Sequence, residues 1–232
     1  MSTFEDIVSR KLSSYIEDST KSISEYKFIL AISGGVDSMV LFQCLNNLGL
    51  YFYTIHFNHN YHVQSNEVSV FLNKCIKDSS SQGHFSISLD LSGAKNFESE
   101  ARDKRYFHLK NLRRRLKCDF ILTGHHLDDQ IETIYMKKLD NSDWISLIGI
   151  REYLGKIRRP MLEISKDKIF KYANDNKLTW IEDPTNRDIS FYRNKIRWQL
   201  LPKEIKQNPN LPTELLGEAI FYKHKFQSVL AN

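Results

Sequence analysis

Apolar positions along the chain alternate between short continuous runs and longer stretches with helical spacing. The run at residues 26–32 is short and apolar and ends at a turn with two glycines, so it predicts a buried strand. Residues 36–47 then place apolar side chains three and four positions apart and stop before Gly49, a pattern typical of a helix. The chain thus begins its regular structure with a strand, a glycine turn and a helix.

This order of elements repeats along the first two thirds of the chain. The pattern predicts further strands at 51–57, 85–91 and 119–124, and further helices at 4–17, 67–78, 99–116 and 128–139. Strands that alternate with helices predict an α/β fold with a doubly wound, mostly parallel sheet. Ligands bind such sheets beyond the carboxyl ends of the strands, so these ends are where functional residues are expected.

The pattern changes near residue 161 to helical segments separated by turns that contain proline. We therefore predict two domains: residues 1–160, which form the α/β domain, and residues 161–232, which form a helical C-terminal extension.

Composition places the chain among ordinary water-soluble proteins. Of its 232 residues, 41% are hydrophobic and 26% are charged. The N-terminus lacks the basic flank and apolar run of a secretion signal, and no apolar stretch reaches the roughly 20 residues of a membrane span. Cys44, Cys75 and Cys118 lie far apart and fit neither a disulfide framework nor a zinc site. These features predict a cytoplasmic protein.

The net charge of +5 allows a nucleic-acid partner without requiring one. Basic residues gather at 113–117, at 151–159 and at 193–197. For each cluster taken alone, a solvated protein face is the more common explanation.

The turn after the first predicted strand has the features of a phosphate-binding loop. Its residues are Ser33, Gly34, Gly35, Val36, Asp37 and Ser38. Two glycines permit a tight turn and close approach of an anion to backbone N–H groups at a helix N-terminus. The serines add hydroxyl donors, and Asp37 is placed to hold Mg²⁺ on the phosphate. Without Gly-Lys-Ser/Thr the loop is not the common P-loop of kinases and GTPases, and a plain strand-to-helix turn stays open.

The loop sequence Ser-Gly-Gly-x-Asp-Ser resembles the signature of the PP-loop ATP pyrophosphatases, which cleave ATP between the α and β phosphates. Later motifs are similar to those of the tRNA(Ile)-lysidine synthetase family, and the resemblance covers roughly residues 26–202. They are His56-Phe57-Asn58-His59, Asn96-Phe97-Glu98, Glu100-Ala101-Arg102 with Arg105-Tyr106, Thr123 to Thr133, Arg159-Pro160-Met161-Leu162, Trp180 to Asn186, and Arg193-Asn194-Lys195-Ile196-Arg197 followed by Leu200-Leu201-Pro202.

The resemblance implies an ATP-dependent ligase that forms a carbon–nitrogen bond. Such an enzyme adenylates the wobble cytidine of an isoleucine tRNA with a CAU anticodon, and free lysine then displaces AMP to give lysidine. The resemblance implies that ATP and Mg²⁺ are required and, by analogy alone, that the protein is a homodimer. It assigns ATP binding to Ser33, Gly34, Gly35, Val36, Asp37, Ser38, His56, Gly124 and His125. It places Mg²⁺ at Asp37 and counts Asp37 among the catalytic residues.

Asp129 and Glu132 are three residues apart and therefore share one face of a predicted helix. Two carboxylates there can hold a lysine ammonium group and help to take its proton. Taken alone, the pair is better explained as acidic residues that complement the helix dipole, but its place beside the glycine loop and the histidine pair favours the lysine site. The resemblance assigns both residues to lysine binding and catalysis.

Arginines supply the remaining predicted contacts with RNA. Arg102 and Arg105 lie one turn apart on the basic helix and suit bidentate phosphate contact or stacking on a base. The resemblance assigns them to catalysis and tRNA binding, and assigns Arg193, Asn194 and Arg197 to tRNA binding. Of His125 and His126, one is expected to face the nucleotide and the other to pack, and the sequence does not say which.

Two segments depart from the family pattern. Asn60-Tyr61-His62 stands where Gly-Leu-Arg is usual, and residues 140–144 replace an Arg-Gly-x-Gly loop. Two alternatives therefore stay open. One is a PP-loop tRNA thiolase, which commonly needs a cysteine pair or an iron–sulfur cluster, and the other is a non-catalytic relative that binds nucleotide or tRNA.

Overall fold

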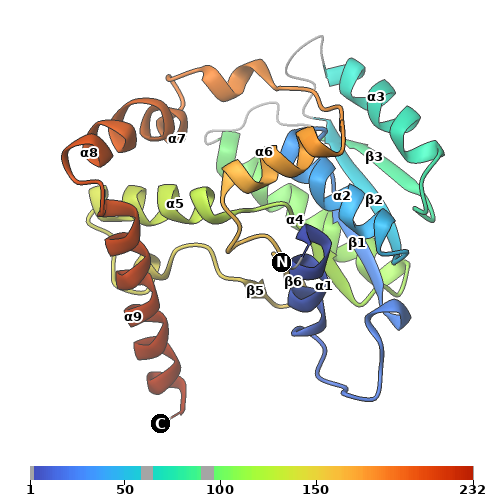
Figure 1. Cartoon of the computed structure of the whole chain (residues 1–232), viewed down its shortest axis with the longest axis horizontal. Coiled ribbons are helices and arrows are strands. Elements are labelled where there is room, and N and C mark those ends of the chain that lie inside the picture. The colour runs from blue at the N-terminus through green and yellow to red at the C-terminus, as the bar shows by residue number, and fades with distance from the viewer. Residues whose placement is uncertain (1–2, 59–64, 90–96, 232) are drawn as a thin grey trace. The chain divides into compact units, whose positions relative to one another are not determined.

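The computed structural model describes residues 3–58, 65–89 and 97–231. These residues form two compact units that alternate along the chain. The first unit takes its residues from Met1–Gly124, Tyr153–Met161 and Asp167–Ile181, and the second from His125–Glu152, Leu162–Lys166 and Glu182–Asn232. Figure 1 labels most of the helices and strands of both units.

The first unit contains a six-stranded sheet with the order β3-β2-β1-β4-β6-β5. The strands are β1 (Lys27–Ala31), β2 (Tyr51–Asn58), β3 (His84–Ser88), β4 (Phe120–Leu122), β5 (Tyr153–Leu154) and β6 (Ile157–Arg158). All neighbouring strands run parallel except β5 and β6, which form an antiparallel hairpin. The predicted α/β fold with a mostly parallel sheet and a helical C-terminal segment is confirmed.

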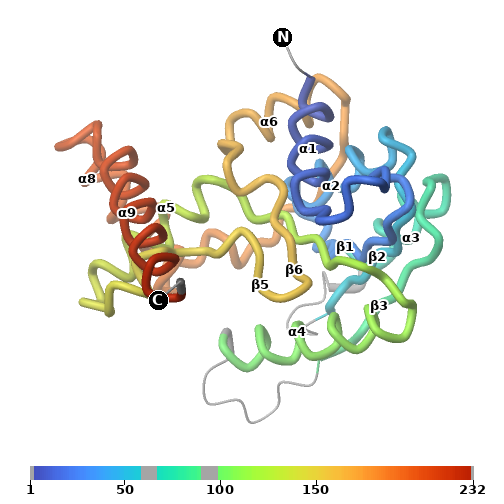
Figure 2. The backbone as a smooth tube through the Cα atoms, turned by 90° about the horizontal axis from the view of Figure 1, so that it is seen from below, coloured from blue at the N-terminus to red at the C-terminus, as the bar shows by residue number. Residues whose placement is uncertain are grey.

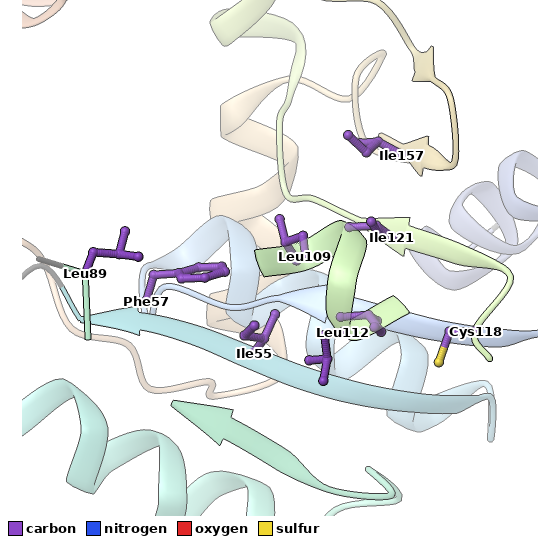
Figure 3. Packing of buried hydrophobic residues seen from close by; sticks show 9 residues of the cluster. Ile55, Phe57, Leu89, Leu109, Leu112, Cys118, Ile121 and Ile157 are labelled. Atoms are coloured by element: carbon purple, nitrogen blue, oxygen red, sulfur yellow. The ribbon is translucent and has the colours of Figure 1, made fainter. Parts of the chain in front are cut away.

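Parallel pairing places isoleucines of neighbouring strands in one row across the sheet. Ile29 of β1 pairs with Ile121 of β4, and Ile121 pairs with Ile157 of β6. All three side chains are almost fully buried and belong to one apolar cluster, which Figure 3 shows together with Leu109 and Leu112. Burial of this row stabilises the sheet because each side chain loses its contact with water, worth roughly 1.5–3 kcal/mol per residue.

Helices cover both faces of this sheet. They are α1 (Phe4–Ser13), α2 (Val36–Asn47), α3 (Ser65–Lys77), α4 (Phe97–Arg115) and all but the first residue of α6 (Lys166–Asp175). Figure 2 shows α4 on one side of the central strands and α1 and α2 on the other. The ring of Phe42 in α2 meets Phe52 of β2 edge-on, with ring centroids 5.8 Å apart, on the face opposite Ile29. Both faces are therefore closed, as a doubly wound fold requires.

The second unit is helical. It contains α5 (Leu127–Leu139), α7 (Tyr192–Lys195), a π-helical turn (Ile196–Leu200), α8 (Leu201–Gln207) and α9 (Leu211–Ala231). Buried Ile134 of α5 packs with Ile196 and with Leu215 of α9. Short 3₁₀ turns occur at Ser146–Ile148 and Pro184–Arg187 here, and at Ile23–Glu25 in the first unit. Within the described ranges no helix is both long and apolar enough to cross a membrane.

The two units divide the chain differently from the predicted domains. Each unit draws on several separate segments, so this division into units does not test a boundary at residue 160, which stays a prediction. The β5–β6 hairpin was not predicted; it lies inside the basic stretch 151–159. Two-residue strands are too short to show a period of two, so only the positive charge of this stretch was visible in the sequence.

Candidate active site

The glycine loop lies where the strand order of the sheet reverses. After β1 the chain adds β2 and β3 on one side, and β4 then pairs with the other side of β1. Residues 32–38 follow β1, and Thr123 and Gly124 follow β4, so both segments lie at the carboxyl edge of this reversal. Such a switch point is where open α/β sheets bind ligands.

Side-chain hydroxyls fix the shape of the loop from within. The buried Ser38 hydroxyl accepts from the Ser33 N–H at 3.1 Å and donates to the Gly35 carbonyl at 2.9 Å. The Ser33 hydroxyl lies 3.1 Å from that of Ser38 and accepts from the Gly35 N–H at 3.3 Å. Both serines therefore hold the backbone turn, while Val36 and Asp37 open α2.

Two glycines are required by the geometry of this turn. Gly34 has a φ of 87°, in the left-handed region that disfavours side chains, and an added Cβ would meet Val68 Cγ1 at 2.9 Å. A Cβ on Gly124 would lie 3.2 Å from the Asp37 carbonyl carbon and from the Ser38 nitrogen. Gly124 therefore permits the segment after β4 to approach the first turn of α2.

His56 braces the start of the loop. It lies near the end of β2 and is almost fully buried, and its Nδ1 lies 3.1 Å from the Ile32 carbonyl oxygen. A carbonyl accepts only, so Nδ1 must carry the proton in this contact. Burial lowers the pKa of His56, although the hydrogen bond to Ile32 opposes this shift, and the neutral ring is favoured. His56 thus contacts the loop backbone.

The two predicted arginines of α4 are exposed. The Arg102 guanidinium lies over the Tyr106 ring, 5.3 Å from its centroid. The Tyr106 hydroxyl in turn accepts from Nη2 of the buried Arg159 at 3.1 Å. Tyr106 therefore connects a buried cation that follows β6 with an exposed one, and contact of Arg102 and Arg105 with RNA stays a prediction.

In the second unit, the predicted carboxylates are paired with two predicted tRNA-binding arginines. Arg193 donates to Asp129 Oδ1 at 3.0 Å and to Glu132 Oε2 at 3.1 Å. Arg197 donates to both oxygens of Glu132, at 2.6 and 2.8 Å, and to Asp129 Oδ1 at 3.4 Å. The Glu132 side chain is only 6% exposed, whereas those of Arg193 and Arg197 are 32% and 28% exposed. The four groups form a charge-balanced cluster that is partly open to solvent.

Opposing effects set the pKa of Asp129. Burial alone would raise it, but the positive charges of His126, when protonated, and of Arg193 outweigh burial, and the pKa is lowered. Asp129 is therefore ionised at neutral pH. Its ionised form can accept hydrogen bonds from an ammonium group as well as from arginine.

The two adjacent histidines have different surroundings. His126 is buried and is the N-cap of α5: its Nδ1 accepts from the Asp129 N–H at 3.4 Å, and its own N–H donates to Asp129 Oδ2 at 3.1 Å. His125 is half-buried. The sequence left open which histidine packs in the protein interior, and the structure shows that it is His126. Contact of His125 with nucleotide stays a prediction.

Asn194 holds a loop of its own unit. Its side chain is buried and donates to the carbonyls of Thr185 and Asp188 at 2.7 and 2.9 Å. Four residues on, the Trp198 indole N–H donates to the Asn186 carbonyl at 2.7 Å. Segment 192–200 therefore has two faces, one bound to α5 through arginines and one bound to loop 183–188. Neither the contacts with α5 nor those with loop 183–188 were predicted, because side-chain contacts are not revealed by the periodicity of a segment.

The segment that departs from the family pattern at residues 140–144 packs within the second unit. The Trp144 ring lies 6.3 Å from that of Tyr222 in α9, and the Lys225 ammonium lies 4.7 Å from the Trp144 ring centroid. Here the departure supplies an aromatic contact with α9. The other departure, Asn60-Tyr61-His62, lies outside the described residues, as do His59, Asn96 and the side chains of Phe97 and Glu98.

The cysteines have the properties of packed thiols. Cys44 and Cys118 are buried, and burial raises their pKa values to about 12 and about 11. Burial also raises the pKa of the half-buried Cys75. A nucleophilic cysteine needs a lowered pKa, so these surroundings do not favour the thiolase alternative.

Comparison with known proteins places this geometry in a family. The model of the PP-loop domain matches residues 4–204. A tRNA(Ile)-lysidine synthase of Francisella tularensis is 32% identical over 211 residues, which are 89% of this chain and 53% of that protein. One of Staphylococcus epidermidis is 34% identical over 198 residues, 79% of this chain and 45% of that protein. The chain thus spans about half the length of these curated relatives.

Solved structures agree with the fold. A U34-tRNA thiolase from Methanococcus maripaludis, solved with its iron–sulfur cluster, gives a TM-score of 0.72 at 18% identity, over 94% of this chain and 79% of that one. At this identity the likeness concerns the fold alone. The domain match, the loop at the switch point of the sheet and the similar curated proteins agree, and the chain belongs to the PP-loop domain family.

Proposed function

We propose that this protein is an ATP-dependent tRNA(Ile)-lysidine synthase. The observation that carries the proposal is the similarity to curated tRNA(Ile)-lysidine synthases over most of this chain, at 32% and 34% identity in two of them. The glycine loop supports the ATP-dependent part of the proposal, because it leads into the N-terminus of α2 at the switch point of the sheet, where backbone N–H groups can bind phosphate. Asp37, in the first turn of α2, is the residue proposed to hold Mg²⁺ on the nucleotide.

The proposed reaction has two steps. The carbonyl oxygen of the wobble cytosine in an isoleucine tRNA attacks the α-phosphorus of ATP, and the bond to pyrophosphate breaks. The ε-amine of free lysine then attacks the activated ring carbon, the bond to AMP breaks, and the amine loses a proton. Here the chain's residues position the reactants and neutralise phosphate charge, which the glycine loop, Arg102 and Arg105 are suited to do.

Lysine must lose a proton before it attacks. The pKa of a lysine ammonium is near 10.4, so almost none is deprotonated at neutral pH without help. Asp129 is ionised and can therefore pair with the ammonium group, which supports the role proposed for it together with Glu132. Because Arg193 and Arg197 already balance these charges, we propose that the arginines fix the carboxylates in place and that lysine shares their oxygens.

The proposal includes a cytoplasmic setting, where free lysine, ATP and tRNA occur together. A homodimer is part of it by family analogy only. The decisive measurement is incorporation of labelled lysine into an isoleucine tRNA transcript with a CAU anticodon, with ATP and Mg²⁺ present. Incorporation that requires ATP and Asp37, and that is absent with methionine tRNA, would establish the function. Nucleotide binding without incorporation by this chain would instead favour the non-catalytic relative.

A further inference from the structure

One face of α4 carries no predicted role and combines cations with an exposed aromatic ring. Leu109 and Leu112 of this helix are buried in the apolar cluster on the sheet, which fixes the opposite side as the outer face. Residues three, four and seven apart share a helix face. The outer face, defined as Lys104, Phe107, Lys110, Asn111, Arg114 and Arg115, thus lies away from the buried leucines, and its cations and Phe107 are exposed.

Phe107 is the centre of this outer face. Its side chain is 62% exposed, and its ring meets His108 edge-on with centroids 5.5 Å apart. Lys104 precedes it by three residues and Lys110 follows it by three, so a cation lies one turn away on each side. A lone exposed phenylalanine needs no explanation, but one set between cations offers both apolar area and positive charge.

Charge narrows the kind of partner that fits. The outer face has four cations; Asp103 lies beside them, and Glu100 lies one turn before Lys104 on the same helix. From Lys104 to Arg114 it extends for roughly 15 Å at the rise of an α-helix. Phosphates of a nucleic-acid strand pair with such a row of cations, and an unpaired base stacks on an exposed aromatic ring. Bases of a duplex are already stacked on each other, so the ring favours a single strand or a loop.

We infer that the outer face of α4 is a binding surface for single-stranded RNA, with Phe107 stacking on an unpaired base and Lys110 and Arg114 contacting the flanking phosphates. The inference rests on the proposed function for the kind of RNA, a tRNA loop. It concerns residues other than Arg102 and Arg105, and it requires no chemistry at the glycine loop.

The test measures affinity for a fluorescein-labelled stem-loop RNA with a CAU loop by fluorescence anisotropy at several salt concentrations. Phe107→Ala should weaken binding about tenfold or more with the salt dependence unchanged, because stacking releases no counterions. Lys110→Ala should lower the slope of log affinity against log salt by about 0.7, the value for one phosphate of a single strand. Phe107→Trp should restore affinity, since the ring still stacks.

Matched variants elsewhere control for exposure and charge. Phe221→Ala removes a ring that is 64% exposed on α9, and Lys168→Ala removes one exposed charge on α6, and neither should alter RNA affinity. Unchanged affinity in Phe107→Ala would overturn the inference, as would equal losses for the stem-loop and the same RNA annealed to its complement. The inference would also be overturned if Phe107→Ala lost binding to anionic lipid vesicles while its RNA binding stayed intact. Lysine incorporation is measured separately, so its absence with Phe107-dependent RNA binding would refute the proposed function and leave this surface standing.

Discussion

At the scale of single residues, a glycine without a side chain and a set of ion-paired side chains define the candidate site. Gly124 allows the segment after β4 to approach the backbone of Asp37 and Ser38. Glu132 is held by two arginines in a cluster with Asp129. Each arrangement makes a different property sensitive to substitution: the shape of the glycine loop in one case and the stability of the second unit in the other.

Gly124→Ala should weaken ATP binding by about tenfold and destabilise the protein by about 1–3 kcal/mol. The added methyl group would lie 3.2–3.3 Å from three backbone atoms of Asp37 and Ser38, so the start of α2 must shift. Isothermal titration with a non-hydrolysable ATP analogue and urea unfolding measure the two effects. Gly217→Ala is the matched control: its Cβ meets nothing within 4 Å inside α9, and it should stabilise by about 0.5–1 kcal/mol. An unaltered affinity in Gly124→Ala would refute the close-approach argument.

Glu132→Gln should destabilise the protein by about 1–3 kcal/mol, because it leaves the partly buried Arg193 and Arg197 with one carboxylate between them. Urea unfolding gives the free energy. Glu218→Gln makes the same chemical change in the exposed Lys138–Glu218 pair and should alter stability by no more than about 0.5 kcal/mol. Equal effects of the two variants would mean that the four-charge cluster contributes no more than a surface ion pair.

At the scale of elements, local patterns predicted most of what was found. The helix predicted at 36–47 is α2, and the strand predicted at 51–57 is β2 with one further residue. Residues 4–17 end earlier as a helix, at Ser13, because the next N–H groups, of Tyr15 and Ile16, donate to carbonyls three residues back and no longer four. The pairing of Arg193 with Glu132 was not predicted, since it joins residues 61 positions apart and periodicity reports only local neighbours.

Segment 192–200 provides the test at this scale. Asn194→Ala should destabilise by about 1–2 kcal/mol, because the carbonyls of Thr185 and Asp188 lose a shared buried donor. Hydrogen exchange at the amides of residues 185–188 should accelerate at the same time. Asn174→Ala, at an exposed position of α6, should leave both the stability and these exchange rates almost as they are. Normal exchange in Asn194→Ala would show that Asn194 does not hold the loop.

At the scale of the whole molecule, the two units alternate along the chain, which an element pattern cannot reveal. The helix α5 follows β4 directly in sequence, yet it belongs to the second unit with α9, while β6 returns to the sheet of the first. Assignment to a unit depends on which apolar surfaces meet, and the sequence states only that apolar surfaces exist. The sheet could therefore be predicted, whereas the division between units could not.

The pH dependence of stability tests the packing of the first unit. Burial, together with the charge of nearby His56 when that ring is protonated, lowers the pKa of His84 from 6.5 to about 4, and its Nδ1 lies 2.8 Å from the Thr54 hydroxyl. Below pH 6.5 the unfolded chain takes up a proton that the folded chain does not, so stability should fall as pH decreases and this contribution should level off near pH 4. Lowered carboxylate pKa values, such as that of Asp129, act at still lower pH.

His84→Gln should therefore show a shallower fall in unfolding free energy between pH 6.5 and pH 4 than the wild-type protein, because glutamine takes up no proton. Urea unfolding across this range gives the two curves. Between pH 8 and pH 9 the histidine is almost entirely neutral in both states, so the curves should stay a constant distance apart there and provide an internal control. Curves that stay parallel down to pH 4 would mean that His84 binds its proton as readily in the folded protein as in the unfolded chain. The packing around Thr54 would then be looser than the half-buried ring and its hydrogen bond indicate.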